Sequence, residues 1–281
     1  MRRFVAVAVI LALGGCASTE RDPEGDRGPA SAAPTPPAAT QPSTPEPGTV
    51  PPDWLFTRAL PVTDTGFGEV RPTPRELRVR RFNLPDSVPP LPGEGFASRV
   101  DQAPAEVIAR STWKPGCPVR RDQLDWVRVT YRGFDGQRHT GELLTHEDVS
   151  ADLVRVFRDL WKARFPIEEM RITEKRELDL KPTGDGNNIG SFVCRPRRGG
   201  TEFSEHARGL AIDINPFQNP YRRGEVVIPE LASAYLDREN VRPGMIFEGG
   251  PVVTAFDAIG WQWGGRWRNL TDLHHFSRNG R

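Results

Sequence analysis

A long stretch near the N-terminus has a composition that disfavours a globular fold. From Ala17 to Pro52 the sequence consists almost entirely of Ala, Ser, Thr, Pro, Gly and charged residues. Such a stretch cannot bury enough apolar surface to offset the entropy lost on ordering it, so we predict an extended tether over residues 16–52. The remainder of this 281-residue chain suits one sizeable domain, or one domain with an extension.

Residues 1–15 precede the tether and have the pattern of an export signal. Two arginines provide a basic start, and the apolar run Phe4–Leu13 is too short to span a bilayer, which needs roughly twenty residues. The following Leu-Gly-Gly-Cys16 resembles the lipobox of bacterial lipoproteins. This resemblance implies cleavage before Cys16, lipidation of its thiol and a mature protein anchored to a membrane outside the cytoplasm. An ordinary secretory signal with an accidental cysteine is the alternative.

Two further cysteines, Cys117 and Cys194, remain once Cys16 is assigned to lipid. An oxidising compartment favours a disulfide between them, and a pair of buried free thiols is the alternative. Neither residue is followed by the local signature of a catalytic cysteine.

The charge balance of the chain argues against a nucleic-acid partner. The sequence has 38 basic and 37 acidic residues and a formal net charge of +1. Proteins that bind nucleic acid usually carry a basic excess. We therefore expect no nucleic-acid partner, and we expect a monomer.

The chain after the tether divides into an extension over residues 53–105 and a main domain over residues 106–281. The extension is punctuated by proline and holds only short strand-like pieces, such as ELRVRRF at residues 76–82. We predict that it packs on the main domain.

The main domain mixes two kinds of apolar pattern. Apolar and polar residues alternate over residues 122–146 around a Gly-Phe-Asp-Gly turn, which favours a β-hairpin. Residues 151–165 place five apolar side chains at helical spacing before Pro166, and residues 252–260 predict another helix. A Gly/Asn-rich loop covers residues 183–190. The mixture of hairpins and helices, without an internal repeat, predicts an α+β fold.

A histidine and a carboxylate stand close together in residues 204–215. From Leu210 the residues alternate, which places two isoleucines on one side of a strand and Asp213 on the other. A lone carboxylate between isoleucines is costly to bury unless it is paired, hydrogen-bonded or bound to a metal. Gly209 lets the backbone turn so that His206 can face the same point, and both side chains are good zinc ligands. A buried Asp–His hydrogen bond explains this pair equally well.

The C-terminal sequence Asp272-Leu-His274-His275-Phe holds a second carboxylate and two more histidines. A carboxylate beside a metal ligand can act as a general base. On a regular strand Asp272 and His275 would face opposite ways, so either Asp272 lies in the turn before the strand or His274 is the ligand. Two histidines in the predicted hairpin lie among charged and turn residues, and we predict them on the surface: His139 and His146.

The combination of Ser-x-His-x-x-Gly-x-Ala-x-Asp with a later Asp-x-x-His-Phe resembles the M15 family of zinc peptidases. That family contains D-alanyl-D-alanine carboxypeptidases and dipeptidases, and L-alanyl-D-glutamate endopeptidases of the cell wall and of phage lysins. The resemblance covers roughly Ser111 to Phe276. Every fixed position of the first element is matched, by Ser204, His206, Gly209, Ala211 and Asp213. Shorter matches to the carboxypeptidase-like branch are Gly116–Val119, Phe134–Gly136, Cys194–Pro196, Asn215–Pro216 and Trp261–Gly265.

Carried over position by position, the resemblance implies a single Zn2+ site made by His206, Asp213 and His275. The implied fold is hedgehog/D-Ala-D-Ala peptidase-like, with a small antiparallel sheet and flanking helices. Asp272 becomes the catalytic base, where several family members have Glu, and His274 becomes a neighbour of the site. Family enzymes also use an arginine to steady the oxyanion, for which Arg195 is our candidate. Three residues are candidates for substrate contacts: Ser204, Arg208 and Trp263. Each has a structural alternative, which is a local hydrogen bond in the turn for Ser204, a surface salt bridge for Arg208, and core packing, the favoured one, for Trp263.

The resemblance implies a zinc-dependent peptidase, either a carboxypeptidase or an endopeptidase, that hydrolyses amide bonds in peptidoglycan stem peptides. These peptides lie in the cell envelope, where an exported lipoprotein can meet them. The alternative is a catalytically silent, zinc-containing lipoprotein that binds the cell wall. The position of Asp272, three residues before His275, speaks against a loss of catalysis. Which bond is cut depends on loops and pocket shape, so the sequence does not select one.

Overall fold

The computed structural model describes residues 46–64, 66–197 and 200–280. The chain divides into the units Met1–Ser43 and Thr44–Arg281, and all the described residues belong to the second. The predicted signal peptide, Cys16 and most of the predicted tether lie outside the described residues. The last tether residues, 46–52, are described and make contacts: the Arg81 amide donates to the Gly48 carbonyl over 2.8 Å. Ordered packing therefore begins before residue 53. No helix within the described ranges has the length and apolarity needed to cross a membrane.

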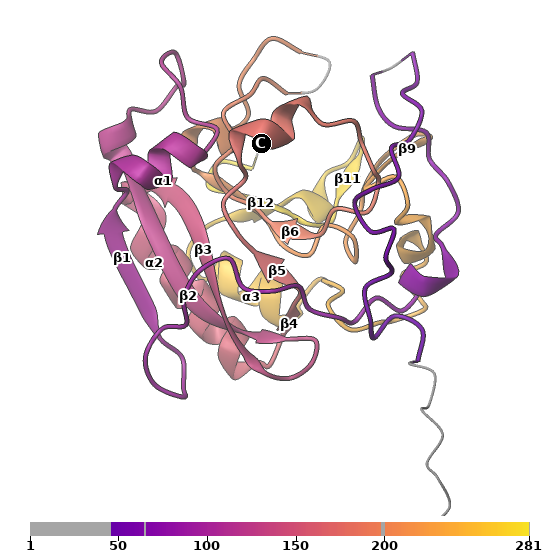
Figure 1. The fold of residues 1–281 in the computed structure, drawn as a ribbon, viewed down its shortest axis with the longest axis horizontal. Helices are drawn as coiled ribbons and strands as arrows, with labels where there is room; N and C mark the ends of the chain where they lie inside the picture. The colour runs from indigo at the N-terminus through magenta and orange to yellow at the C-terminus, as the bar shows by residue number, and fades with distance from the viewer. Residues whose placement is uncertain (1–45, 65, 198–199, 281) are drawn as a thin grey trace, which may run out of the picture. The chain divides into compact units, whose positions relative to one another are not determined.

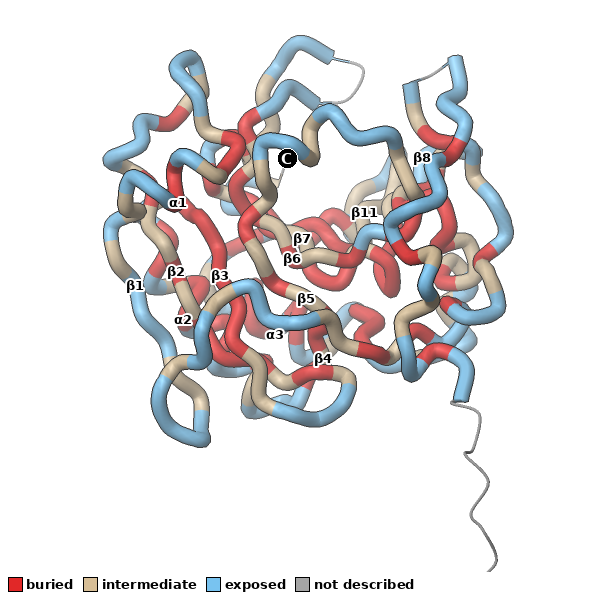
Figure 2. Tube along the Cα trace, viewed as in Figure 1, coloured by how far each residue is buried: buried red, intermediate tan, exposed pale blue. Residues whose placement is uncertain are grey.

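The largest sheet has the order β1-β2-β3, with antiparallel neighbours, and β4 pairs in parallel with β2 (Figure 1). β2 and β3 form the hairpin that the alternation predicts. β1 comes from the predicted extension, so part of that segment belongs to the main sheet. Figure 2 shows β1 as an exposed edge and β3 as buried along most of its length. The bounds are β1 Ser98–Gln102, β2 Leu124–Gly133, β3 Arg138–His146 and β4 Pro166–Ile167.

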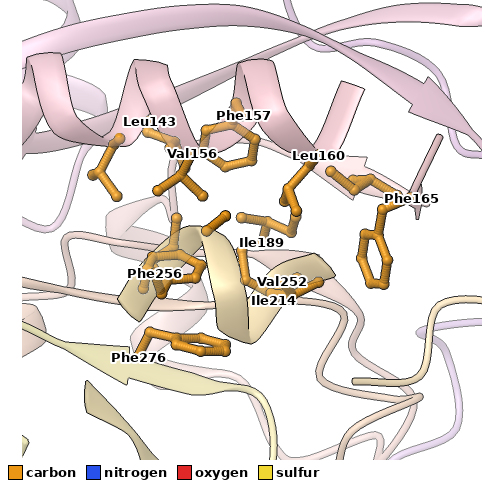
Figure 3. Packing of buried hydrophobic residues seen from close by; sticks show 14 of the residues in the cluster. Leu143, Val156, Phe157, Leu160, Phe165, Ile189, Ile214, Val252, Phe256 and Phe276 are labelled. Carbon is orange, nitrogen blue, oxygen red and sulfur yellow. The ribbon is translucent and has the colours of Figure 1, made fainter. Parts of the chain in front are cut away.

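Helix α2 (Glu147–Lys162) packs on β2 of this sheet and against α3 (Pro251–Asp257), while a shorter helix, α1 (Ala105–Arg110), precedes the hairpin. Four of the five apolar residues at helical spacing are buried, whereas Trp161 is half-buried. Figure 3 shows Phe157 and Leu160 of α2 facing the α3 side chains, with Phe276 beyond them. This layer between α2, α3 and a C-terminal strand is the main hydrophobic core. It fixes the strands that carry the candidate site.

Three smaller sheets occupy the C-terminal half, with orders β10-β12-β7, β11-β8-β9 and β5-β6. The first two are antiparallel and the third is parallel. Small, mostly antiparallel sheets with few helices agree with the predicted α+β class. The strands are β5 Glu169–Met170, β6 Asn188–Ile189, β7 Ala211–Asp213, β8 Tyr221–Arg223, β9 Val226–Ile228, β10 Gln262–Trp263, β11 Thr271–Asp272 and β12 His275–Ser277. Short 3-10 turns are η1 Arg75–Leu77, η2 Arg121–Gln123, η3 Lys175–Asp179, η4 Glu205–Arg208, η5 Ser233–Leu236 and η6 Gly264–Arg266.

The extension contains no strand at residues 76–82, so that expectation is wrong. Its first residues belong to η1 and the rest runs as irregular chain, because its backbone and side chains bond to distant segments instead of to a neighbouring strand. The extension packs on the main domain through a second core of its own. That core joins Leu55, Leu60, Leu77 and Phe82 to Phe217, Leu231, Ala232, Tyr235 and Met245.

A disulfide joins Cys117 to Cys194, with their Cα atoms 5.9 Å apart. Both cysteines pack in a third apolar cluster, which also contains Leu144 of β3 and Phe192. The disulfide thus ties the segment before β2 to the segment that leads into the candidate site.

Candidate metal centre

Two neighbouring strands place Asp213 and His275 side by side. In the antiparallel pair of β7 and β12, Asp213 lies directly opposite His275, and Ile212 lies opposite Phe276. Directly opposite residues of an antiparallel pair point to the same face of the sheet. Ile212 and Phe276 therefore share the core face, where Phe276 stacks on Phe256 at a centroid distance of 4.1 Å. The polar pair is left on the other face, where its atoms Oδ1 and Nδ1 are 3.1 Å apart.

A tight turn brings His206 to the same point. The 3-10 turn η4 ends at Gly209, whose φ of 70° is a left-handed conformation that glycine adopts without strain. A Cβ there would also lie 2.6 Å from the amide nitrogen of His146. The turn leads directly into β7, so His206 and Asp213 face each other across it. The His206 Nδ1 lies 2.7 Å from the Ser191 carbonyl, which can only accept, so this nitrogen is the protonated one.

Three ligand-type atoms converge as a result. Nε2 of His206 lies 3.2 Å from Oδ1 of Asp213 and 3.2 Å from Nδ1 of His275. Among the described residues, these three side chains form the one group whose geometry could hold a metal ion. The structure thus brings together the three predicted ligands.

Asp272 and His274 lie beside this group. β11, which holds Asp272, pairs with β8, whereas β12 pairs with β7, so the chain changes sheet between Asp272 and His275. This break removes the strict alternation that would have set the two side chains on opposite faces. The His274 Nδ1 donates to the Asn219 carbonyl over 2.7 Å, and its Nε2 lies 3.0 Å from Oδ1 of Asp272. His274 is therefore a neighbour and His275 belongs to the converging group.

Comparison with protein-family models gives one match to the segment that carries these residues. Residues 198–278 match the model described as D-alanyl-D-alanine carboxypeptidase. Both elements that carry the M15 resemblance lie in this matched segment, and the match supports a peptidase. Searches of curated proteins and of solved structures find no match.

Burial and mutual charge shift the pKa values of three groups at or beside the converging atoms, Asp213, His206 and Asp272. Burial alone would raise the pKa of Asp213, but the surrounding imidazoles, His206 first, hold that pKa well below its ordinary value. Burial lowers the pKa of His206, and the Asp213 carboxylate outweighs this effect, so the pKa is raised. Burial raises the pKa of Asp272, although His274 and His275 oppose this rise. The pKa values of the two carboxylates, Asp213 and Asp272, are thus shifted in opposite directions.

A cleft of about 270 Å³ opens beside the converging atoms, and His206 and Asp213 form part of its lining. Arg195 and Ser204 also line this cleft. Arg208 does not line it, and its Nε lies 3.6 Å from the Glu205 carboxylate on a half-exposed surface. Trp263 is buried in the main core, where its indole donates to the Leu273 carbonyl over 2.9 Å. Of the two alternatives for Trp263, substrate contact or core packing, the structure supports core packing.

Several residues of the cleft were not singled out in the sequence. One side is formed by the Gly/Asn-rich loop, through Gly186, Asn187 and Asn188, and by Pro229. The composition of this loop indicates only irregular structure, without indicating what it lines. The Ser191 carbonyl, which orients His206, is a backbone group and has no signature in the sequence. His139 and His146, predicted on the surface, are only partly exposed: His139 is flanked by two carboxylates and His146 caps α2.

Proposed function

We propose that this protein is a zinc-dependent peptidase that hydrolyses amide bonds in the stem peptides of peptidoglycan. The observation that carries the proposal is the convergence of His206, Asp213 and His275 on one point at the edge of a cleft. The match of residues 198–278 to a D-alanyl-D-alanine carboxypeptidase model supports the reaction class.

The donor atoms fit zinc in kind and in spacing. Zinc is held by imidazole nitrogen and carboxylate oxygen at about 2.0–2.2 Å, so ligand atoms at tetrahedral angles lie about 3.3 Å apart. The three atoms here are separated by 3.1 to 3.2 Å. Because the proton of His206 is on Nδ1, its Nε2 presents a lone pair toward the Asp213 oxygen, which is also an acceptor. Two acceptors facing each other in a buried site need either a cation or a second proton on His206 between them, and a zinc ion would serve both.

A zinc ion held by these side chains would act as a Lewis acid toward the amide carbonyl and the attacking water. Asp272 accepts the proton of the water and delivers it to the leaving amine. Its raised pKa suits both steps, because a general base works best when its pKa approaches the operating pH. His274, held by the Asn219 carbonyl, keeps a ring nitrogen next to the Asp272 carboxylate.

Arg195 supplies positive charge at the cleft. Its guanidinium lies close enough to His206 to oppose protonation of that imidazole. A fixed cation beside the scissile bond stabilises the negative charge that develops on the carbonyl oxygen, and this interaction is stronger in the transition state than in the ground state. We assign Arg195 this role, and Ser204 a hydrogen bond to the substrate.

The proposed substrate agrees with the proposed location. The signal-like residues 1–15 and Cys16 would place the mature protein outside the cytoplasm, anchored by lipid, where peptidoglycan lies. The tether that follows would give the domain reach from the membrane.

Digestion of muropeptides of known stem composition tests the proposal. The protein should release D-alanine or a short peptide, detected by mass spectrometry, and a chelator should stop this release until zinc is restored. Asp213→Ala, assayed alongside, should be inactive with or without zinc. Stoichiometric zinc without cleavage of any stem peptide would instead identify a wall-binding module.

A further inference from the structure

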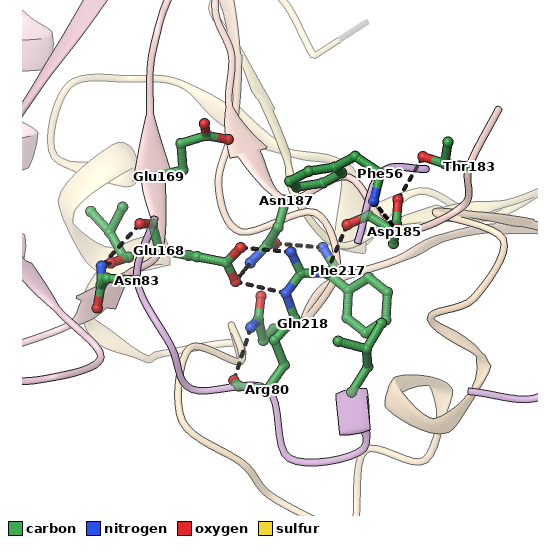
Figure 4. A network of polar contacts seen from close by, with 12 residues as sticks. Phe56, Arg80, Asn83, Glu168, Glu169, Thr183, Asp185, Asn187, Phe217 and Gln218 are labelled. Atoms are coloured by element: carbon green, nitrogen blue, oxygen red, sulfur yellow. Dashed lines mark hydrogen bonds and ion pairs between the residues drawn. The ribbon is translucent and has the colours of Figure 1, made fainter. Parts of the chain in front are cut away.

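The predicted extension holds a fully buried arginine, Arg80, that reaches the loop lining the cleft. Arg80 donates to both carboxylate oxygens of Glu168, over 2.7 and 2.6 Å, and to the backbone carbonyl of Asp185 over 2.7 Å (Figure 4). The side chains of Arg80 and Glu168 have no exposed surface. Their sequence positions are 88 residues apart, so this pair joins two distant parts of the chain.

The same carboxylate orients a residue of the cleft wall. Oε2 of Glu168 also accepts from Nδ2 of Asn187 over 2.7 Å, and Oδ1 of Asn187 accepts from the Phe217 amide over 2.8 Å. Asn187 lines the cleft, as does Pro216, the neighbour of Phe217 in sequence. A chain of hydrogen bonds therefore runs from the extension, through a buried ion pair, to two segments that line the cleft.

The loop that receives these bonds has little rigidity of its own. Residues 183–190 contain three glycines, which leave the backbone many conformations. The extension restrains this loop at further points: the Phe56 amide donates to the Asp185 carboxylate over 2.8 Å. A Cβ at Gly184 would lie 2.6 Å from a methyl group of Leu60. The extension thus packs closely against this loop.

The ion pair of Arg80 and Glu168 is better suited to orienting its neighbours than to stabilising the fold. Replacing a buried ion pair by apolar residues of similar volume is often neutral or stabilising, because desolvation of the two charges offsets their attraction. A bidentate arginine, however, fixes the plane of the carboxylate and leaves one oxygen aimed at Asn187. An apolar pair at these positions would pack equally well and leave the Asn187 side chain without its acceptor.

We propose that Arg80 is a positioning residue for catalysis, acting through Glu168 and Asn187 to fix the wall of the substrate cleft. This inference rests on the proposed peptidase function. It assigns the extension, which lies outside the segment that matches the carboxypeptidase model, a part in substrate binding.

The test replaces both partners at once, in Arg80→Met/Glu168→Met, so that no unpaired charge stays buried. The matched control is Arg110→Met/Glu142→Met, which removes another pair with a buried carboxylate, located between α1 and β3 and away from the cleft. Arg80→Lys keeps the positive charge but cannot make the bidentate hydrogen bonds to Glu168. It serves as a milder variant should the double variant fail to fold. Zinc content, thermal midpoint, peptide kinetics and amide hydrogen exchange are measured for each.

We expect the Arg80→Met/Glu168→Met protein to fold and bind zinc as the wild type does. Its KM for the peptide should rise by about tenfold to a hundredfold with a smaller change in kcat. The amides of residues 184–190 and of Phe217 should exchange faster. Arg80→Lys should change KM and amide exchange less. The control variant, Arg110→Met/Glu142→Met, should leave KM and amide exchange at wild-type values.

A folded double variant with wild-type KM and wild-type exchange in this loop would overturn the inference. Equal changes in the control would also overturn it, because they would reflect a general loss of stability. If the wild type cleaves no peptide, the proposed function fails, and the exchange comparison still decides whether Arg80 fixes the loop.

Discussion

The candidate metal centre and the cluster around His139 both combine histidine with aspartate, and they are built in opposite ways. In the candidate metal centre, one nitrogen from each of His206 and His275 and one oxygen of Asp213 lie 3.1 to 3.2 Å from each other. At His139, Asp86 lies 2.8 Å from Nδ1 and Asp135 lies 3.1 Å from Nε2. The ring nitrogens point away from each other, so the two carboxylates flank the ring and do not share a point with it.

The difference shows that composition does not identify a metal site. Both clusters contain the residue types that bind zinc, and both have carboxylates within hydrogen-bonding distance. Only convergence of lone pairs creates a position for a cation, because each ligand must direct its donor atom at one centre. The flanked histidine instead joins the extension, through Asp86, to the turn of the hairpin.

Removing the shared carboxylate should have the largest effect. We expect Asp213→Ala to lose both zinc and hydrolysis, because two neutral imidazoles hold the ion too weakly. Asp86→Ala is the matched change in the other cluster and should keep both. Elemental analysis and a peptide-release assay measure these outcomes, and zinc retained at wild-type affinity in Asp213→Ala would remove this residue from the ligand set.

Removing the proposed base should separate metal binding from catalysis. Asp272→Asn keeps the shape of the side chain, so zinc should remain, while kcat falls by about a hundredfold to ten-thousandfold. Asp135→Asn, which alters a carboxylate next to His139, should leave kcat unchanged. Wild-type turnover in Asp272→Asn would assign proton transfer to another group.

The cleft arginine should contribute less than the base. For Arg195→Met we expect kcat to fall by about a hundredfold to a thousandfold with unchanged zinc content, because one transition-state contact is lost. Arg208→Met serves as its control, since Arg208 does not line the cleft. Equal losses in the two variants, measured by steady-state kinetics, would show that neither arginine has a specific role.

The smallest effect is expected at the flanked histidine. His139→Asn removes contacts to both carboxylates, and the free energy of unfolding should fall by about 1 kcal/mol. Zinc content and hydrolysis should not change. Denaturant unfolding measures the free energy of unfolding, and elemental analysis and the peptide-release assay measure zinc content and hydrolysis. A loss of zinc in this variant would show that the two clusters are linked.

The parts of the site that follow from the sequence are those set by local spacing. His206, Gly209 and Asp213 belong to one turn and strand, so their order along the chain carries their geometry. The choice between His274 and His275 did not follow from alternation, because the chain moves from β11 to β12, in two different sheets, between Asp272 and His275. Such a break depends on the strands that pair with each piece.

The same distinction holds for the fold: elements set by neighbouring residues could be predicted from the sequence, and those set by distant contacts could not. The hairpin of β2 and β3 and the helix α2 follow from apolar periodicity, which depends on neighbours in sequence. The conformation of the extension did not follow from periodicity, because it is set by contacts with residues far away in the sequence, such as Glu168 for Arg80. Residues 76–82 alternate enough to predict a strand and yet pair with none, since Arg80 turns inward to an ion pair.

Zinc binding by the purified protein tests the central claim most directly. Metal analysis together with X-ray absorption at the zinc edge reports both the number of ions and their ligands. We predict one zinc per chain, bound by two imidazole nitrogens and one carboxylate oxygen, with at least one position taken by water. Absence of zinc from protein reconstituted with it, or a shell completed entirely by protein atoms, would contradict the account.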